Sequence, residues 1–103
     1  MAKRSVDYRE NLIESLKDPE EAIAYLRATL EENDMPEVFL LALRNVAEAR
    51  GMQWLAREAH LNRESLYRML SENGNPELRS LHALLSALGL RLALEPKEAQ
   101  ARS

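Results

Sequence analysis

The 103-residue sequence contains no cysteine, which excludes disulfides, thiolate metal sites and thiol nucleophiles. It has only three glycines, and none lies in a glycine-rich phosphate-binding pattern. The two histidines, His60 and His82, do not have the spacing of a metal-ligand pair. We therefore expect no enzyme activity, no cofactor and no metal site.

Long apolar runs are also lacking. No segment of the sequence approaches the roughly 20 apolar residues of a membrane-spanning helix. Residues 1–8 include two basic side chains but not the apolar stretch of a secretory signal. The composition, 46% hydrophobic and 30% charged, is typical of one soluble domain. We expect a cytoplasmic protein without membrane contact.

Charge is unevenly distributed along the chain, although the net charge is only −3. Residues 1–35 hold five basic and nine acidic side chains, whereas residues 36–103 hold nine basic and eight acidic ones. An acidic balance argues against strong non-specific binding to nucleic acid, but it is compatible with a local basic face. The acidic front segment fits either a basic protein partner or an ordinary solvated surface.

Helix signals follow one another along the chain. Asp18-Pro19 and Asp34-Met35-Pro36 are typical helix starts, and Gly51 and Gly89 are typical helix ends. We predict an all-α fold of about five helices that contains a helix–turn–helix of the phage-repressor kind. The expected segments are about 8–17 (a short helix or turn), 18–32, 34–50, two helices within 52–71, and 76–89.

Residues 90–95, Leu-Arg-Leu-Ala-Leu-Glu, place leucine at every second position, as in a β-strand. A lone strand in a helical chain must pair with a copy of itself, pair with another protein, or not form. We therefore divide the single domain, residues 1–103, into four parts: an acidic helical region (1–35), a helix–turn–helix core (36–89), a candidate strand (90–95) and a flexible tail (96–103).

Residues 52–71 carry the helix–turn–helix pattern. A small side chain such as Ala56 is needed where two helices cross steeply. His60 stands in the turn, where the backbone often needs a positive φ that histidine tolerates better than most residues. Trp54 is expected to cap the core. The expected inner faces consist of Leu55, Ala56 and Ala59 on the first helix, Leu61 at the turn, and Leu66, Met69 and Leu70 on the second helix.

Polar side chains occupy the outward arc of the second helix. Such a helix suits the major groove of DNA. The alternative is an ordinary solvated face, on which Glu64 and Arg68 form an i, i+4 ion pair. Asn62 is expected to cap the helix, at a position that also suits a phosphate contact. The outward residues are Arg63, Glu64, Tyr67, Arg68 and Ser71.

The chain contains ARGMQWLAREA at 49–59, NRESLYR at 62–68, GNP at 74–76 and ALGLRL at 87–92, with DPEEA at 18–22 and YL at 25–26 upstream. In these segments it resembles the addiction-module antidote proteins, the prophage-associated HigA-type antitoxins with a helix–turn–helix. The resemblance covers about residues 15–95. It implies a dimer that binds double-stranded operator DNA, represses its own operon and neutralises a RelE/ParE-type toxin, a small basic protein encoded beside it.

The resemblance also implies a recognition helix at residues 63–71. We expect its two arginines to contact bases or phosphates, its tyrosine to contact a phosphate or a thymine methyl group, and Gln53 and Asn62 to position the protein on the DNA backbone. Alternatives are a stand-alone prophage regulator without a toxin and a helical adaptor that binds only protein. The predicted DNA-binding residues are Gln53, Asn62, Arg63, Glu64, Ser65, Tyr67 and Arg68.

Overall fold

The computed structural model describes residues 2–32 and 34–97, with side chains from residue 8 onward. The described residues form six α-helices and no strand, so the predicted all-α class is confirmed. There are six helices rather than about five because the expected short helix or turn at 8–17 is part of a full helix. The helices are α1 (Ala2–Ser15), α2 (Pro19–Glu32), α3 (Pro36–Arg50), α4 (Met52–Ala59), α5 (Arg63–Met69) and α6 (Leu78–Ala87).

The two predicted proline starts differ in their chemistry. Asp18 caps α2 as expected, because its Oδ1 accepts a hydrogen bond from the backbone N–H of Glu20 at 3.0 Å. At α3, Pro36 is the first helical residue and Met35 occupies the N-cap, with no side-chain cap bond. Asp34 stands one residue too early to cap, so the expectation that the second start repeats the first is wrong in this detail.

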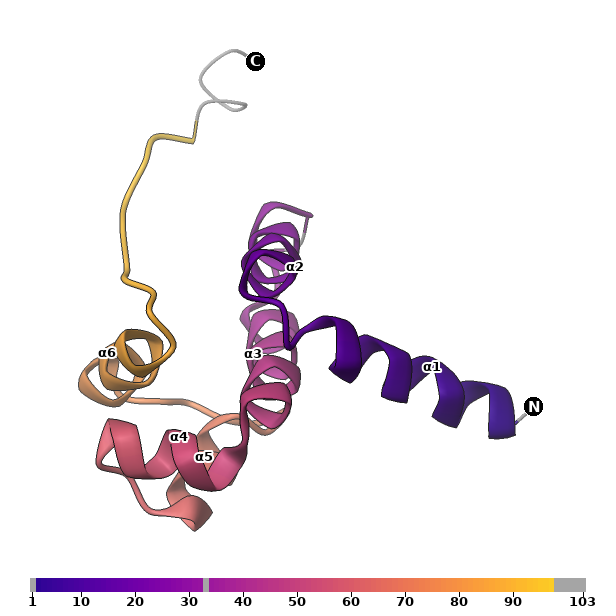
Figure 1. Cartoon of the computed structure of the whole chain (residues 1–103). Helices are drawn as coiled ribbons and strands as arrows, with labels where there is room; N and C mark the ends of the chain where they lie inside the picture. The colour runs from indigo at the N-terminus through magenta and orange to yellow at the C-terminus, as the bar shows by residue number, and fades with distance from the viewer. Residues whose placement is uncertain (1, 33, 98–103) are drawn as a thin grey trace.

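The apolar core connects all six helices. Helix α2 packs on α3, α3 on α4, and α4 on both α5 and α6. Helix α1 packs against α3 and otherwise extends away from the body of the protein (Figure 1). No polar or charged side chain is buried among the described residues. The largest fully buried side chains are Leu16, Leu43, Leu55, Leu66, Leu70 and Leu84.

The chain after α6 is extended. Gly89 has φ +82°, and residues 90–97 then run away from α6 without helix or strand (Figure 1). The candidate strand at 90–95 is therefore not formed within the described chain, because an otherwise helical protein offers it no neighbouring strand. Most of the predicted flexible tail, residues 98–103, lies outside the described residues. Over the part that is described, no helix has the length and apolarity to cross a membrane.

Candidate nucleic-acid interface

The turn between α4 and α5 is closed by backbone hydrogen bonds. His60 adopts φ 59° and ψ 41°, the left-handed conformation that its position predicted. Its N–H donates to the carbonyl of Arg57 at 3.2 Å, and the N–H of Leu61 donates to the carbonyl of Ala56 at 2.9 Å. These two bonds form a Schellman motif. Leu61 packs against the core as expected, so the turn holds α5 in a defined direction.

Helix α5 begins at the predicted cap. Asn62 is extended and its Oδ1 accepts a hydrogen bond from the backbone N–H of Ser65 at 2.7 Å. Leu66 and Leu70 are fully buried and fix the inner side of α5. The helix ends at Met69, two residues earlier than expected, and Leu70 is its C-cap. A short helix thus lies on the core with its other side turned outward.

All seven predicted DNA-binding residues lie on the α4–α5 unit. Gln53 is exposed in the first turn of α4, and the other six belong to α5 and its cap. Ser65 and Tyr67 are half-buried. We call the exposed part of α5 the outer edge; it consists of Asn62, Arg63, Glu64 and Arg68.

Tyr67 differs most from its prediction. Its ring is half-buried and packs against the core rather than standing on the outward arc. The guanidinium carbon of Arg44 lies 5.3 Å from the ring centroid, and that of Arg63 lies 5.9 Å from it. Both distances suit a cation–π contact. Tyr67 therefore positions two arginines, and its hydroxyl is the group that remains for a phosphate.

Arg68 is free of the ion pair that the solvated-face alternative assigns to it. Its Nη2 donates to Ser65 Oγ at 3.3 Å, and no ion pair with Glu64 occurs among the described residues. A guanidinium has five N–H donors, so this single long bond leaves most of them available. The exposed Arg68 can therefore reach a base edge or a phosphate with its charge uncompensated.

Arg44 is a cationic neighbour of α5 that sequence reasoning missed. It lies on α3, and its Nε is 3.6 Å from Glu48 Oε2. Glu48 also pairs with Arg9 of α1. Nothing in the local sequence places Arg44 beside Tyr67, because the two are far apart in the chain and meet only when α3 and α5 both pack on α4. Polar contacts thus run from α1 through α3 to α5.

A second set of contacts joins α1, α2 and α3. Arg9 Nη1 donates to Asn45 Oδ1 at 3.0 Å, and Asn45 Nδ2 donates to the Tyr25 hydroxyl at 2.9 Å. At the last residue of α3, the Arg50 guanidinium lies 4.8 Å from the centroid of the Trp54 ring. Trp54 is half-buried against the core, as its prediction as a cap of the core requires.

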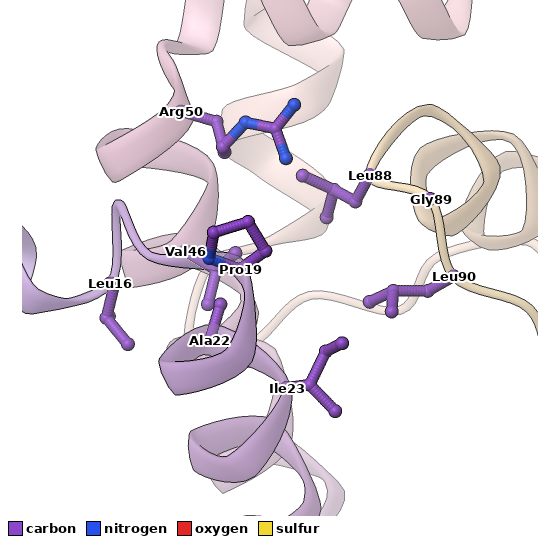
Figure 2. Close-up of a pocket in the computed structure, with 9 residues that line it drawn as sticks. All are labelled: Leu16, Pro19, Ala22, Ile23, Val46, Arg50, Leu88, Gly89 and Leu90. Atoms are coloured by element: carbon purple, nitrogen blue, oxygen red, sulfur yellow. The ribbon is translucent and has the colours of Figure 1, made fainter.

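An apolar cavity lies away from the predicted DNA-binding residues, between α2, α3 and the chain that follows α6 (Figure 2). Arg50 is its only charged lining residue. Such a lining offers few donors for a polar ligand. The lining residues are Leu16, Pro19, Ala22, Ile23, Val46, Arg50, Leu88, Gly89 and Leu90.

Comparison with known proteins identifies the family. An uncharacterized protein of Haemophilus influenzae is 36% identical over 85 residues, which cover 82% of this chain and 87% of that relative. No solved structure matches the chain. Residues 8–96, which include the whole α4–α5 unit, match the family described as "Probable addiction module antidote protein". The chain therefore belongs to the family of probable addiction module antidote proteins.

Proposed function

We propose that this antidote protein is a non-catalytic antitoxin that binds operator DNA as a homodimer through its α4–α5 unit, represses its own operon and neutralises a RelE/ParE-type toxin. The observation that carries the DNA-binding part is the outer edge of α5. It presents two exposed arginines on a helix whose opposite side is held by fully buried leucines. A rigid helix with a polar outer side is the element that enters the major groove in helix–turn–helix proteins.

The proposed contacts follow from which groups remain available. Asn62 uses its Oδ1 as the helix cap, so only its amide N–H groups are left to donate to a phosphate. Arg68 reads a base edge or contacts a phosphate, and Arg63 contacts the backbone. Gln53, exposed at the start of α4, adds a further backbone contact. Glu64 and Ser65 complete the surface that faces the groove.

Substitution of Arg68 tests the DNA-binding part. The probe is a fluorescent duplex with the sequence upstream of the protein's own gene, and binding is measured by anisotropy. Arg68→Ala should weaken binding by about 1–3 kcal/mol, which is roughly fivefold to 150-fold. The matched control is Arg27→Ala, which removes an equal charge from an exposed position on α2. Equal affinities of the two variants would remove Arg68 from the interface.

The toxin contact is proposed at the junction of α2 and α3. Three large apolar side chains are exposed there: Leu30 at the end of α2, Met35 before α3, and Leu41 on α3. Exposed carboxylates stand beside them at Glu31, Glu32 and Asp34. Exposed apolar side chains with negatively charged neighbours in the chain suit a small basic protein.

Charge reversal tests the toxin contact separately from the DNA contact. The double variant Glu31→Lys/Glu32→Lys should lose co-purification with the product of the neighbouring gene and keep its affinity for operator DNA. The control Glu10→Lys/Glu14→Lys makes the same charge change on exposed positions of α1. If the wild-type protein binds the duplex but not the neighbouring product, it is a regulator without a toxin. If it binds only protein, it is an adaptor.

A further inference from the structure

The extended chain after α6 exposes leucines on one side. We call residues 90–97 the C-terminal arm. Leu90 is half-buried and lines the apolar cavity together with Ile23 (Figure 2). Leu92 is 47% exposed and Leu94 is fully exposed. Because side chains alternate along an extended chain, these leucines lie on the same side as Leu90. An extended arm with an exposed leucine side is suited to pair with another strand.

We propose that the arm pairs antiparallel with the same arm of a second copy, centred on Ala93, and that this ribbon is the dimer interface of the proposed DNA-binding homodimer. The inference rests on the proposed function only for the existence of a dimer. In this register Ala93 faces the partner's Ala93, Leu92 faces the partner's Leu94, and Arg91 faces the partner's Glu95. The arm is therefore complementary to itself on both of its faces.

Other registers lose this complementarity. Centring on Leu92 places Arg91 opposite the partner's Ala93, and centring on Leu94 places Arg91 opposite the partner's Lys97, a like charge. A shift by one residue moves the leucines of the two arms to opposite faces. Opposite charges across an antiparallel pair are favourable and like charges are unfavourable. The charges at Arg91, Glu95 and Lys97 thus select one register and a second copy as the partner.

The position of Pro96 is compatible with the same register. If the two Ala93 residues form a hydrogen-bonded pair, then pairs alternate outward from them, and Pro96 faces the partner's Leu90 at a non-hydrogen-bonded position. Proline is tolerated there because its missing N–H has no bond to make. The Leu92 pairs also become non-hydrogen-bonded, which brings their side chains into closest contact.

The apolar cavity explains how so short a ribbon is held. Two isolated strands are marginally stable in water, so their apolar face must pack on something. The leucine side of the arm begins at Leu90, which lines the cavity between α2, α3 and the chain that follows α6 (Figure 2). The paired leucines continue this apolar surface outward, so the ribbon covers the open side of the cavity. Dimerisation then removes both the exposed leucines and the open cavity from water.

Cross-linking tests the register in the full-length protein, which has no native cysteine. Ala93→Cys should form a covalent dimer under mild oxidation, because facing residues lie about 5.5 Å apart between their Cα atoms, within disulfide range. The control Arg91→Cys lies on the same face of the arm. In the proposed register, position 91 faces the partner's Glu95, which is four residues from the partner's position 91. The two copies of position 91 therefore lie about 14 Å apart and should cross-link poorly. Equal cross-linking of the two variants, or none in Ala93→Cys, would overturn the proposal.

Charge exchange tests the pairing by affinity. Arg91→Glu and Glu95→Arg should each weaken the dimer by about fivefold to thirtyfold in sedimentation equilibrium, since each acts on two symmetric pairs. The double variant Arg91→Glu/Glu95→Arg should regain most of the affinity. Failure of this rescue would contradict the register. If the wild-type protein is a dimer that binds operator DNA, but the arm variants dimerise as tightly as the wild type, the arm inference alone is overturned. If the arm variants weaken the dimer, but the wild-type protein does not bind operator DNA, the proposed function alone is overturned.

Discussion

A methyl group added at Gly74 should strongly lower the free energy of unfolding. A Cβ added there would lie 2.8 Å from the carbonyl carbon of Met69 and 3.0 Å from the carbonyl oxygen of Ser71, and closer still to the carbonyl oxygen of Met69. All three are backbone atoms at the last residue of α5 or just after it. Gly74 also donates its N–H to the carbonyl of Ser71 at 2.9 Å, which holds the two segments together. The glycine of the Gly-Asn-Pro segment is therefore required by its close approach to the C-terminal end of α5.

The expected loss for Gly74→Ala is about 2–3 kcal/mol of unfolding free energy, because overpacking against atoms that cannot rotate away costs about 1–3 kcal/mol. Gly89→Ala is the matched control. Gly89 has φ +82° but no atom within 4 Å of an added Cβ, so only the left-handed backbone is penalised, by about 1 kcal/mol. Gly74 is not among the residues with positive φ. The comparison thus separates contact from conformation.

Urea unfolding followed by far-ultraviolet circular dichroism measures both losses. Taking about 1–2 kcal/mol per molar urea for a chain of this size, Gly74→Ala should lower the urea midpoint by about 1–3 M. Gly89→Ala should lower it by about half as much or less. If Gly74→Ala were as stable as the wild type, or lost less than Gly89→Ala, the close packing of Gly74 on the end of α5 would be refuted.

Three further predictions follow from the α4–α5 unit. Asn62→Ala should lower unfolding free energy by about 1 kcal/mol, and Asn62→Asp should keep the wild-type value, because the carboxylate of that variant can still accept the Ser65 N–H; a thermal scan that ranks the two variants equally would contradict the cap. Arg44→Gln should lower the free energy of unfolding by about 0.5–1 kcal/mol through loss of the contact with Tyr67, whereas Arg63→Gln should mainly lower operator affinity. Denaturant titration measures the first effect and anisotropy the second; a stability loss in Arg63→Gln and an affinity loss in Arg44→Gln would contradict this assignment. Operator affinity should fall by about 150-fold between 50 and 200 mM salt if Arg63 and Arg68 of both subunits neutralise four phosphates. An affinity that does not change with salt in an anisotropy titration would exclude these phosphate contacts.

Local chemistry made much of the fold predictable from sequence. Asn62, the cap of α5, and His60, the left-handed residue of the turn, both act on backbone groups a few residues away. Their roles therefore followed from residue type and spacing. The predicted DNA-binding residues gathered on one unit for the same reason, since six of the seven are consecutive or nearly so in the chain.

What escaped prediction depends on packing between distant segments. Arg44 of α3 meets Tyr67 of α5 only because both helices pack on α4 and the Tyr67 ring packs against the core. Arg68 bonds to Ser65 and not to Glu64, the partner that the solvated-face alternative gave it, because helical spacing leaves the choice of rotamer open. The lone strand at 90–95 is not formed in a single chain because strand pairing needs a neighbour, which is the same fact that motivates its pairing with a second copy.

In the proposed function, the outer edge of α5 is the surface that meets DNA. Backbone amide chemical shifts of the ¹⁵N-labelled protein, titrated with a duplex of its own upstream sequence, test it most directly. We expect the largest shift changes at residues 62–68 and at Gln53, with α1 and α2 nearly unchanged. Changes concentrated on α1 and α2, with residues 62–68 unaffected, would contradict it.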